Sequence, residues 1–263
     1  MLNRNEEKRR NLLFTICARA GSKGVQGKNV REFCKMPLAV YTIAAFGLFK
    51  ARFEKEFGQI TLAVNTDSDT LIQQMDRLKT EYLYIPRTKE LAGDVVAKKD
   101  VIKDTMIKCE KDSGVIYDVI MDLDLTSPLR TVDDIRGTLR ALEENETADI
   151  AYSVTSSRRS PYFNMVMEKD GYYGTVIGTK FTTRQQCPQC YDMNASIYAY
   201  RREYMTMDQV MPRRDVIWQM KDTGILDIDS EEDLELMEVL AGYFYQNYPA
   251  YREIREEAAR LLE

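Results

Sequence analysis

The segment between Arg19 and Asn29 contains the residue types that bind a polyphosphate. It follows the apolar run Leu12–Ile16, which predicts a short buried strand. Glycines allow backbone N–H groups to approach anionic oxygens, and cationic side chains supply the opposing charge. We predict a phosphate-binding loop, with an ordinary solvated surface turn as the alternative. Its cations and its hydroxyl are Arg19, Ser22, Lys23 and Lys28.

The glycine spacing in this loop differs from the two commonest phosphate motifs. Gly21, Gly24 and Gly27 are each separated by two residues, so the Gly-x-Gly-x-x-Gly pattern of dinucleotide-binding folds is absent. A Walker A motif needs Ser or Thr after its Gly-Lys pair, whereas Asn29 follows Lys28 here. The spacing therefore disfavours both a P-loop NTPase and a dinucleotide-binding dehydrogenase.

Two aspartates near the C-terminal end of the chain, Asp227 and Asp229, are candidate metal ligands. A strand over this segment would place both carboxylates on one face. Such close like charges repel each other unless a cation lies between them. Mg²⁺ (or Mn²⁺) would neutralise the two carboxylates and bridge them to a phosphate. The alternative is a solvated strand end that caps a helix beginning near Ser230.

Two further patterns have both a functional and an ordinary interpretation. Asp122 and Asp124 alternate before Thr126 and Arg130. The functional interpretation is a group of carboxylates, a hydroxyl and an arginine at the carboxyl end of a predicted strand, where a ligand would bind. The ordinary interpretation is a strand followed by a helix N-cap. The Cys187-x-x-Cys190 pair has no second pair and no histidine for a zinc site, so we interpret it as part of a loop.

The composition narrows the class of protein. With 263 residues, 44% hydrophobic residues and a net charge of -5, the chain predicts a folded protein whose main task is not to hold nucleic acid. Its polar first ten residues lead us to expect no secretory signal, and no apolar stretch is long enough for a membrane helix. Its five scattered cysteines fit a reduced, cytoplasmic protein. The absence of histidine excludes histidine-based nucleophilic catalysis and HExxH zinc sites.

Short apolar runs alternate with amphipathic stretches in the first half of the chain. This pattern predicts an α/β fold whose mostly parallel sheet is flanked by helices, with ligands at the carboxyl ends of the strands. The predicted strands are Leu12–Ile16, Ile60–Val64, Tyr82–Ile85, one within Val115–Leu125, and Ile150–Val154. The predicted helices are Leu38–Phe49, Thr70–Lys79, Lys99–Lys111 and Thr131–Asn145.

The remaining chain divides at a change of composition. Between Ser156 and Trp218 helical periodicity is weak, which predicts strands and loops that cover the substrate or form a subunit interface. The segment Ser230–Glu263 looks helical, with Ser230 as its N-cap. We predict an α/β domain over residues 11–155 and 192–263, an insertion over 156–191, and a flexible segment over 1–10.

Taken together, these residues resemble one family, the acylneuraminate cytidylyltransferases or CMP-sialic acid synthetases. Five ordered motifs are far more specific than any one of them. The matching segments are Ala18–Gly24 with Lys28 and Asn29, Arg87–Ala92 with Asp94, Thr126–Arg130, Arg184–Gln186 with Asn194–Tyr198, and Asp227–Asp229 with Glu232 and Asp233.

The resemblance implies a Rossmann-like sheet of the nucleotide-diphospho-sugar transferase type and a reaction between CTP and a nonulosonic acid that yields a CMP-sugar and pyrophosphate. It also implies a homodimer formed through the 156–191 insertion. The implied nucleotide-binding residues are Arg19, Ser22, Lys23, Lys28, Asn29 and Arg87, and the implied metal ligands are Asp227 and Asp229. The implied sugar-binding residues are Asp124, Arg184 and Gln185, and the implied catalytic residues are Arg19, Lys23 and Asp229.

Two positions depart from the family pattern. Asp124 stands where the family often has a glutamine that contacts the sugar, and Lys98 stands where small hydroxyl residues are common. The segment Thr15–Arg19 is similar to the branch that acts on legionaminic acid. Two other hypotheses stay open: a related nucleotidyltransferase with another nucleotide or acceptor, and a non-catalytic nucleotide-binding regulator.

Overall fold

The computed structural model describes residues 9–21, 25–207, 213–224 and 227–263. The strands are β1 (Leu12–Ala18), β2 (Glu32–Phe33), β3 (Met36–Pro37), β4 (Ile60–Thr66), β5 (Leu83–Pro86), β6 (Val119–Leu123), β7 (Ile150–Ser156), β8 (Val166–Lys169), β9 (Tyr172–Thr175), β10 (Tyr191–Arg201) and β11 (Asp215–Gln219). The α-helices are α1 (Leu38–Phe53), α2 (Asp69–Arg77), α3 (Lys98–Ser113), α4 (Val132–Glu143), α5 (Arg202–Thr206), α6 (Glu231–Asn247) and α7 (Pro249–Arg260). Three 3-10 helices are η1 (Lys28–Val30), η2 (Lys89–Leu91) and η3 (Arg184–Gln186).

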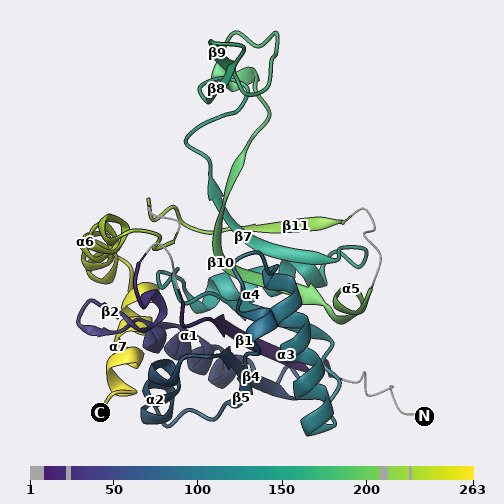
Figure 1. Ribbon diagram of the computed structural model, residues 1–263, viewed down its shortest axis with the longest axis vertical. Coiled ribbons are helices and arrows are strands. Elements are labelled where there is room, and N and C mark those ends of the chain that lie inside the picture. Colours follow the sequence, from purple (N-terminus) through teal and green to yellow (C-terminus); the bar gives the residue numbers. More distant parts are fainter. Residues whose placement is uncertain (1–8, 22–24, 208–212, 225–226) are drawn as a thin grey trace, which may run out of the picture.

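Seven strands form one sheet in the order β11-β7-β10-β6-β1-β4-β5 (Figure 1). All neighbouring pairs are parallel except those of β10, which runs antiparallel to both β6 and β7. The mostly parallel α/β sheet expected from the alternating pattern is thus confirmed. The carboxyl ends of β1, β4, β5 and β6 meet at one edge, where open α/β sheets bind their ligands.

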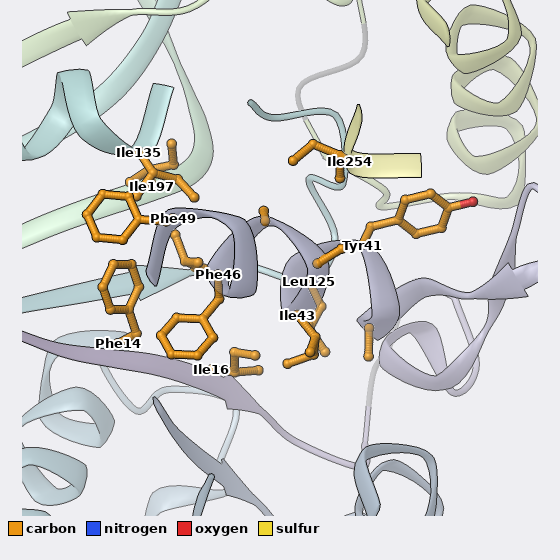
Figure 2. Packing of buried hydrophobic residues seen from close by; sticks show 14 of the residues in the cluster. Phe14, Ile16, Tyr41, Ile43, Phe46, Phe49, Leu125, Ile135, Ile197 and Ile254 are labelled. Carbon is orange, nitrogen blue, oxygen red and sulfur yellow. The ribbon is translucent and has the colours of Figure 1, made fainter. Parts of the chain in front are cut away.

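Side chains alternate between the two faces of β1, so each face has its own core. Leu12, Phe14 and Ile16 pack in the larger core with α1 and α4, whereas Leu13 packs on the other face with α3. Phe14 contacts the rings of Phe46 and Phe49, each at 5.1 Å between centroids (Figure 2). This double-sided burial fixes β1 and therefore the starting point of the loop that follows it.

An arm rises from the sheet between the end of β7 and the start of β10 (Figure 1). It contains the β8–β9 hairpin and η3, and every residue of the two hairpin strands is exposed. The sequence predicted strands and loops here, and this description is confirmed. The division into two domain segments and an insertion stays a prediction.

Two local expectations need correction, and a third is confirmed. β10, which lies in the region of weak periodicity, is a central strand of the main sheet. The segment expected to be one helical stretch is two helices, because Tyr248 leaves the helical conformation and Pro249 begins α7, where a proline lacks the N–H that a helix interior requires. The N-cap at Ser230 is confirmed, since its side chain accepts from the backbone of Asp233 in a capping box. Within the described ranges no helix is both long and apolar enough to cross a membrane.

Candidate active site

A cavity of about 280 Å³ opens at the carboxyl ends of β1, β5 and β6. It brings together predicted site residues that lie more than 200 positions apart in the sequence, since Arg19 and Asp227 both line it. A larger cavity of about 540 Å³ lies at the amino end of β4 and holds none of them. The predicted residues that line the first cavity are Arg19, Lys28, Asn29, Arg87, Asp124 and Asp227. Ser22 and Lys23 lie outside the described residues.

The loop after β1 is held in place by contacts from both sides. The backbone N–H of Ala20 donates to Asp67 Oδ1 at 2.7 Å, and Asn29 Nδ2 donates to the carbonyl of Arg19 at 3.0 Å. Gly27 has φ of 63°, in the left-handed region that favours glycine, immediately before η1. Asn29 therefore acts on the loop backbone in this structure, and the glycine is needed for the turn.

Two arginines of the site are anchored by neighbouring chain segments. Arg19 Nη1 donates to Asp94 Oδ1 at 2.8 Å and to the carbonyl of Ala92 at 3.3 Å. Arg87 Nε donates to Asn65 Oδ1 at 2.8 Å, at the end of β4. Burial lowers the pKa of Arg87, and nearby acidic groups oppose that shift. Both guanidinium groups are thus held at the rim of one cavity, where they can face an anion.

Asp227 and Asp229 lie in a loop, so the strand predicted for them is wrong. Residues 227–229 pair with no strand among the described residues; instead, the N–H of Ile228 donates to the carbonyl of Thr126 at 3.0 Å, and the side chain of Ile228 is buried. Because the side chain of Ile228 points into the core, the carboxylates of Asp227 and Asp229 point away from the core. Lys28 Nζ lies 2.8 Å from Asp229 Oδ1, which connects the predicted phosphate-binding loop with the acidic pair.

The acidic pair has unequal environments. Asp229 is 71% exposed, whereas Asp227 is partly buried in the cavity wall. Burial, and then the neighbouring charge of Asp229, raise the pKa of Asp227, while Lys28 opposes the shift. A carboxylate pair of this kind is more stable in its ionised form when a cation neutralises it.

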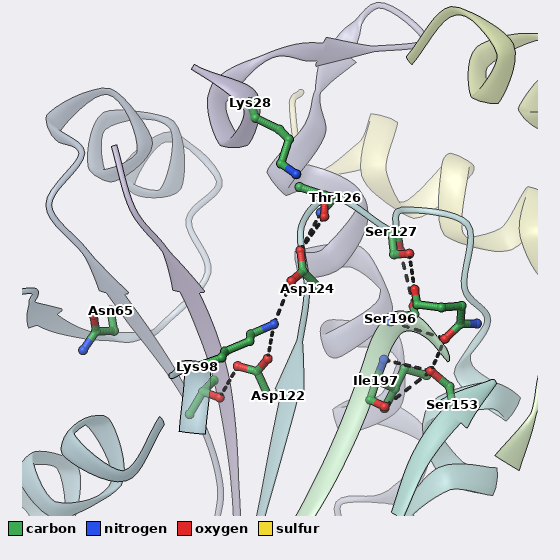
Figure 3. Close-up of polar contacts among 12 residues, drawn as sticks. Lys28, Asn65, Lys98, Asp122, Asp124, Thr126, Ser127, Ser153, Ser196 and Ile197 are labelled. Carbon is green, nitrogen blue, oxygen red and sulfur yellow. Dashed lines mark hydrogen bonds and ion pairs between the residues drawn. The ribbon is translucent and has the colours of Figure 1, made fainter. Parts of the chain in front are cut away.

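An ionic cluster lies at the cavity: Lys98 and Asp124 line it and are partly exposed, and the fully buried Asp122 contacts Lys98 (Figure 3). Lys98 Nζ lies 2.7 Å from Asp122 Oδ2 and 2.7 Å from Asp124 Oδ2. Burial alone would lower the pKa of Lys98, but the two carboxylates raise it well above its usual value. Burial would likewise raise the pKa of Asp124, yet Lys98 and the N–H and hydroxyl of Thr126 hold it below its usual range. Lys98 and Asp124 are therefore both charged at neutral pH.

The segment after β6 is fixed by the polar side chains of two matching motifs. Arg130, which is 1% exposed, donates to the carbonyls of Asp124 and Ser127. The hydroxyl of Ser127 donates to the carbonyl of Asn194 at 2.9 Å, and Ser153 Oγ donates to Asn194 Oδ1 at 2.6 Å (Figure 3). In this chain these residues hold the end of β6 against β10, which keeps Asp124 at the cavity.

The structure does not bring all predicted sugar-binding residues together. Asp124 lines the first cavity, whereas Arg184 and Gln185 line a separate cavity of about 400 Å³ on the arm. There Arg184 donates to the carbonyl of Ser157 at 3.2 Å. Within one chain, the two groups therefore belong to different sites.

Three further residues of the site were given no role from the sequence. Asp94 anchors Arg19, Lys98 places a cation at the cavity, and the buried Asp122 pairs with that cation. Lys98 and Asp122 are 24 positions apart with no spacing rule between them. A signal was nevertheless present in the sequence. Lys98 and Asp124 both depart from the family pattern, one to a cation and the other to a carboxylate, and such a pair of changes indicates that the two residues could contact each other.

Comparison with known proteins assigns the chain to a family. A family model described as "Cytidylyltransferase" matches residues 13–255. A protein from Campylobacter jejuni named "CMP-N,N'-diacetyllegionaminic acid synthase" is 35% identical over 230 residues, which is 87% of this chain and 94% of the relative. "Post-translational flagellin modification protein B" from Campylobacter coli is 34% identical over the same shares.

Solved structures show the same fold at low sequence identity. A CMP:2-keto-3-deoxy-manno-octonic acid synthetase complexed with CTP superposes with a TM-score of 0.63 at 16% identity, covering 89% of this chain and 99% of the other. A 4-diphosphocytidyl-2C-methyl-D-erythritol synthase gives a TM-score of 0.59 at 10% identity, covering 88% and 98%. With the family match over residues 13–255, these findings show that the chain is a nucleotidyltransferase and belongs to the cytidylyltransferase family.

Proposed function

We propose that the protein activates a nonulosonic acid with CTP, giving the CMP-sugar and pyrophosphate. The observation that carries the proposal is the single cavity around which Arg19, Arg87, Lys28 and the Asp227 loop converge. Cationic side chains suit the triphosphate, and the nearby carboxylates suit a metal. The relative named for CMP-diacetyllegionaminic acid synthesis supports an acylated nonulosonic acid as the acceptor.

In this proposal the anomeric hydroxyl of the sugar acid attacks the α-phosphorus of CTP, and pyrophosphate leaves in line. Such transfers depend on positioning and on charge stabilisation. Arg19 and Lys28 are placed to hold the triphosphate, together with Lys23, which the structure does not describe. Their charges would stabilise the departing pyrophosphate. A chain without histidine can carry out this step because no imidazole is required.

Asp227 and Asp229 are the residues that would hold Mg²⁺ or Mn²⁺. Their donor set fits, because both offer hard oxygen ligands and the pKa of Asp227 is raised by burial and by its acidic neighbour. The described part of the chain has no cluster of three or more acidic or sulfur ligands, and Mg²⁺ is commonly held by two carboxylates with substrate phosphates and water. When bound, the ion withdraws charge from the phosphate and favours the deprotonated hydroxyl.

The arm supports a homodimer. Its hairpin and neighbouring loops expose large apolar side chains, which is unfavourable unless a second surface covers them. The exposed apolar residues are Phe163, Met165, Val166, Met167, Tyr172, Tyr173, Val176, Ile177 and Phe181. A second copy of the chain could place the Arg184 cavity next to a partner's CTP site, where the guanidinium would match the sugar carboxylate.

A nucleotide screen tests the proposal against its alternatives. Pyrophosphate release is measured with each of the four NTPs, with and without a nonulosonic acid. We expect release only with CTP and only when the acid is present. Release with UTP, or with another sugar or alcohol, would favour a different nucleotidyltransferase. Tight CTP binding without any release would favour a regulator.

A further inference from the structure

Lys98 carries a charged head group that the proposed CTP site does not account for. It lies at the start of α3, lines the cavity, and reaches across to the end of β6 (Figure 3). We propose that Lys98 and Asp124 together recognise an acylamino group of the sugar acid and so determine which acceptor is used. This inference rests on the function proposed above.

The head group of Lys98 is fixed before any ligand arrives. Asp122 is fully buried, and its Oδ1 accepts from the hydroxyl of Thr15 at 2.7 Å, so this carboxylate cannot turn away. The ring of Tyr198 on β10 lies 5.6 Å from the ammonium. A cation held in this way loses little further side-chain freedom when it binds a ligand.

The cluster also has donor and acceptor capacity left for a ligand. An ammonium carries three N–H groups, and among the described residues Asp122 and Asp124 take two of them. Asp124 Oδ1 already accepts from both the N–H and the hydroxyl of Thr126. Its Oδ2 accepts from Lys98 and retains a second lone pair. One N–H and one carboxylate oxygen thus remain, side by side, at the cavity.

The charge of the cluster indicates what kind of group fits. The formal charges of Lys98, the two aspartates and the neighbouring buried Arg130 cancel, so the cluster has no surplus positive charge for a carboxylate or a phosphate and suits a neutral group. An acylamino group is neutral and offers a carbonyl acceptor and an N–H donor together. The position agrees, because the cluster lies on the β6–β10 side of the cavity, whereas Arg87 follows β5 and Arg19 follows β1. The nucleotide base, which also carries adjacent donors and acceptors, is the competing ligand.

The test pairs a protein variant with a ligand variant. The acceptors are an acylamino nonulosonic acid and its analogue with hydrogen in place of that acylamino group. We expect the unaltered enzyme to prefer the acylamino acid by about 10- to 100-fold in kcat/KM, the range for hydrogen bonds to charged groups, and Lys98→Met to reduce the preference to about 3-fold or less. Lys99→Met is the control, because this neighbour lies over the ring of Tyr204 and should keep the preference.

Two additional measurements make the result decisive. CTP affinity by calorimetry should change by less than about two-fold in Lys98→Met; a large loss of CTP affinity with an unchanged acceptor preference would assign Lys98 to the base and overturn the inference. Should Lys98→Met fail to fold, Lys98→Met with Asp122→Asn removes one charge of each sign and must lose the preference in the same way. An enzyme that makes no CMP-sugar from either acceptor and binds neither acid would refute the proposed function and this inference together. Normal turnover with a retained acceptor preference, both in Lys98→Met and in the double variant, would refute this inference and leave the proposed function intact.

Discussion

At the scale of single residues, three cations of the site are each paired with carboxylates in the described structure. Arg19 contacts Asp94, Lys28 contacts Asp229, and Lys98 contacts two aspartates. Charges held in pairs near a surface contribute little to folding but remain available for ligands. We infer that the acidic partners keep the cations in place until substrate and metal exchange with them.

Asp229 provides the first residue-scale prediction. Asp229→Asn should lower kcat/KM for CMP-sugar formation by roughly 100-fold or more, because the variant removes a charge proposed to hold the metal at the reacting phosphate. Its melting temperature should change little, since the side chain is 71% exposed. Glu231→Gln is a matched control: this exposed carboxylate pairs with Arg31 in a similar way but lies outside the proposed metal site. Wild-type turnover in Asp229→Asn would rule out the metal assignment.

The proposed metal site predicts that the effect of Mg²⁺ on stability depends on pH. Burial and Asp229 raise the pKa of Asp227, so its protonated form favours folding, and that stability is lost as the pH rises through the raised value. A divalent cation that binds the ionised pair should offset the loss. Mg²⁺ at about ten times its Kd should therefore add about 1.4 kcal/mol of stability at neutral pH, and less near pH 4, where Asp227 takes up a proton.

Thermal melting with Mg²⁺, with Mn²⁺ and with a chelator checks this expectation. The variant with both Asp227→Asn and Asp229→Asn serves as control and should show no cation-dependent shift. An equal shift in the double variant would place the cation elsewhere.

Residue spacing revealed only part of the site. The Asp-x-Asp pair and the cationic loop stand out because their partners are neighbours in the sequence. The Lys98 cluster does not, because α3 and β6 must pack before its ammonium meets two carboxylates. The separation of Arg184 from Asp124 was equally hidden, since it depends on how far the arm carries η3 from the sheet (Figure 1).

At the scale of elements, local patterns predicted the parallel strands and the helices that cover them. β1, α1, α3 and α4 were expected within a few residues of their observed bounds, because apolar periodicity reports burial directly. β10 was not recognised as a central strand. Its ladder with β7 is interrupted between Met193 and Tyr198, and Ala195 has a positive φ of 53°, so the strand lacks a regular alternation.

Helix packing supplies an element-scale prediction. A Cβ added at Gly137 in α4 would overlap the indole ring of Trp218 on β11. Gly137→Ala should therefore lower the free energy of unfolding by about 1–3 kcal/mol through overpacking. Gly47→Ala in α1 is the matched change, because a Cβ there meets nothing within 4 Å. It should raise the free energy of unfolding by about 0.5–1 kcal/mol through helix propensity. Urea denaturation of both variants measures the difference, and equal effects would contradict this packing.

At the scale of the whole molecule, the sheet and the arm carry different groups of predicted site residues. The sheet gathers the predicted nucleotide-binding residues at one edge, while the arm carries the predicted sugar-binding residues Arg184 and Gln185 on an exposed projection. Local sequence patterns predict that the arm consists of strands and loops. These patterns do not indicate which surface the arm contacts, because in the proposed dimer that surface belongs to a second copy of the chain.

Subunit complementation tests the proposed dimer. If Arg184 serves a partner's site, a hybrid of Asp229→Asn and Arg184→Ala subunits contains one site with both residues intact. Random one-to-one mixing should then restore about a quarter of wild-type activity, since half of the dimers are hybrids with one working site each. Each variant alone should be nearly inactive. A mixture no more active than its components would mean that Arg184 acts within its own chain or not at all.

The measurement that tests the central claim most directly is identification of the product by mass spectrometry and phosphorus NMR. The intact protein is incubated with CTP, Mg²⁺ and an acylated nonulosonic acid such as diacetyllegionaminic acid. The account predicts one CMP group joined to the anomeric oxygen of the acid for each pyrophosphate released. Pyrophosphate released with free CMP as the only nucleotide product, or CTP consumed equally without any sugar acid, would contradict it.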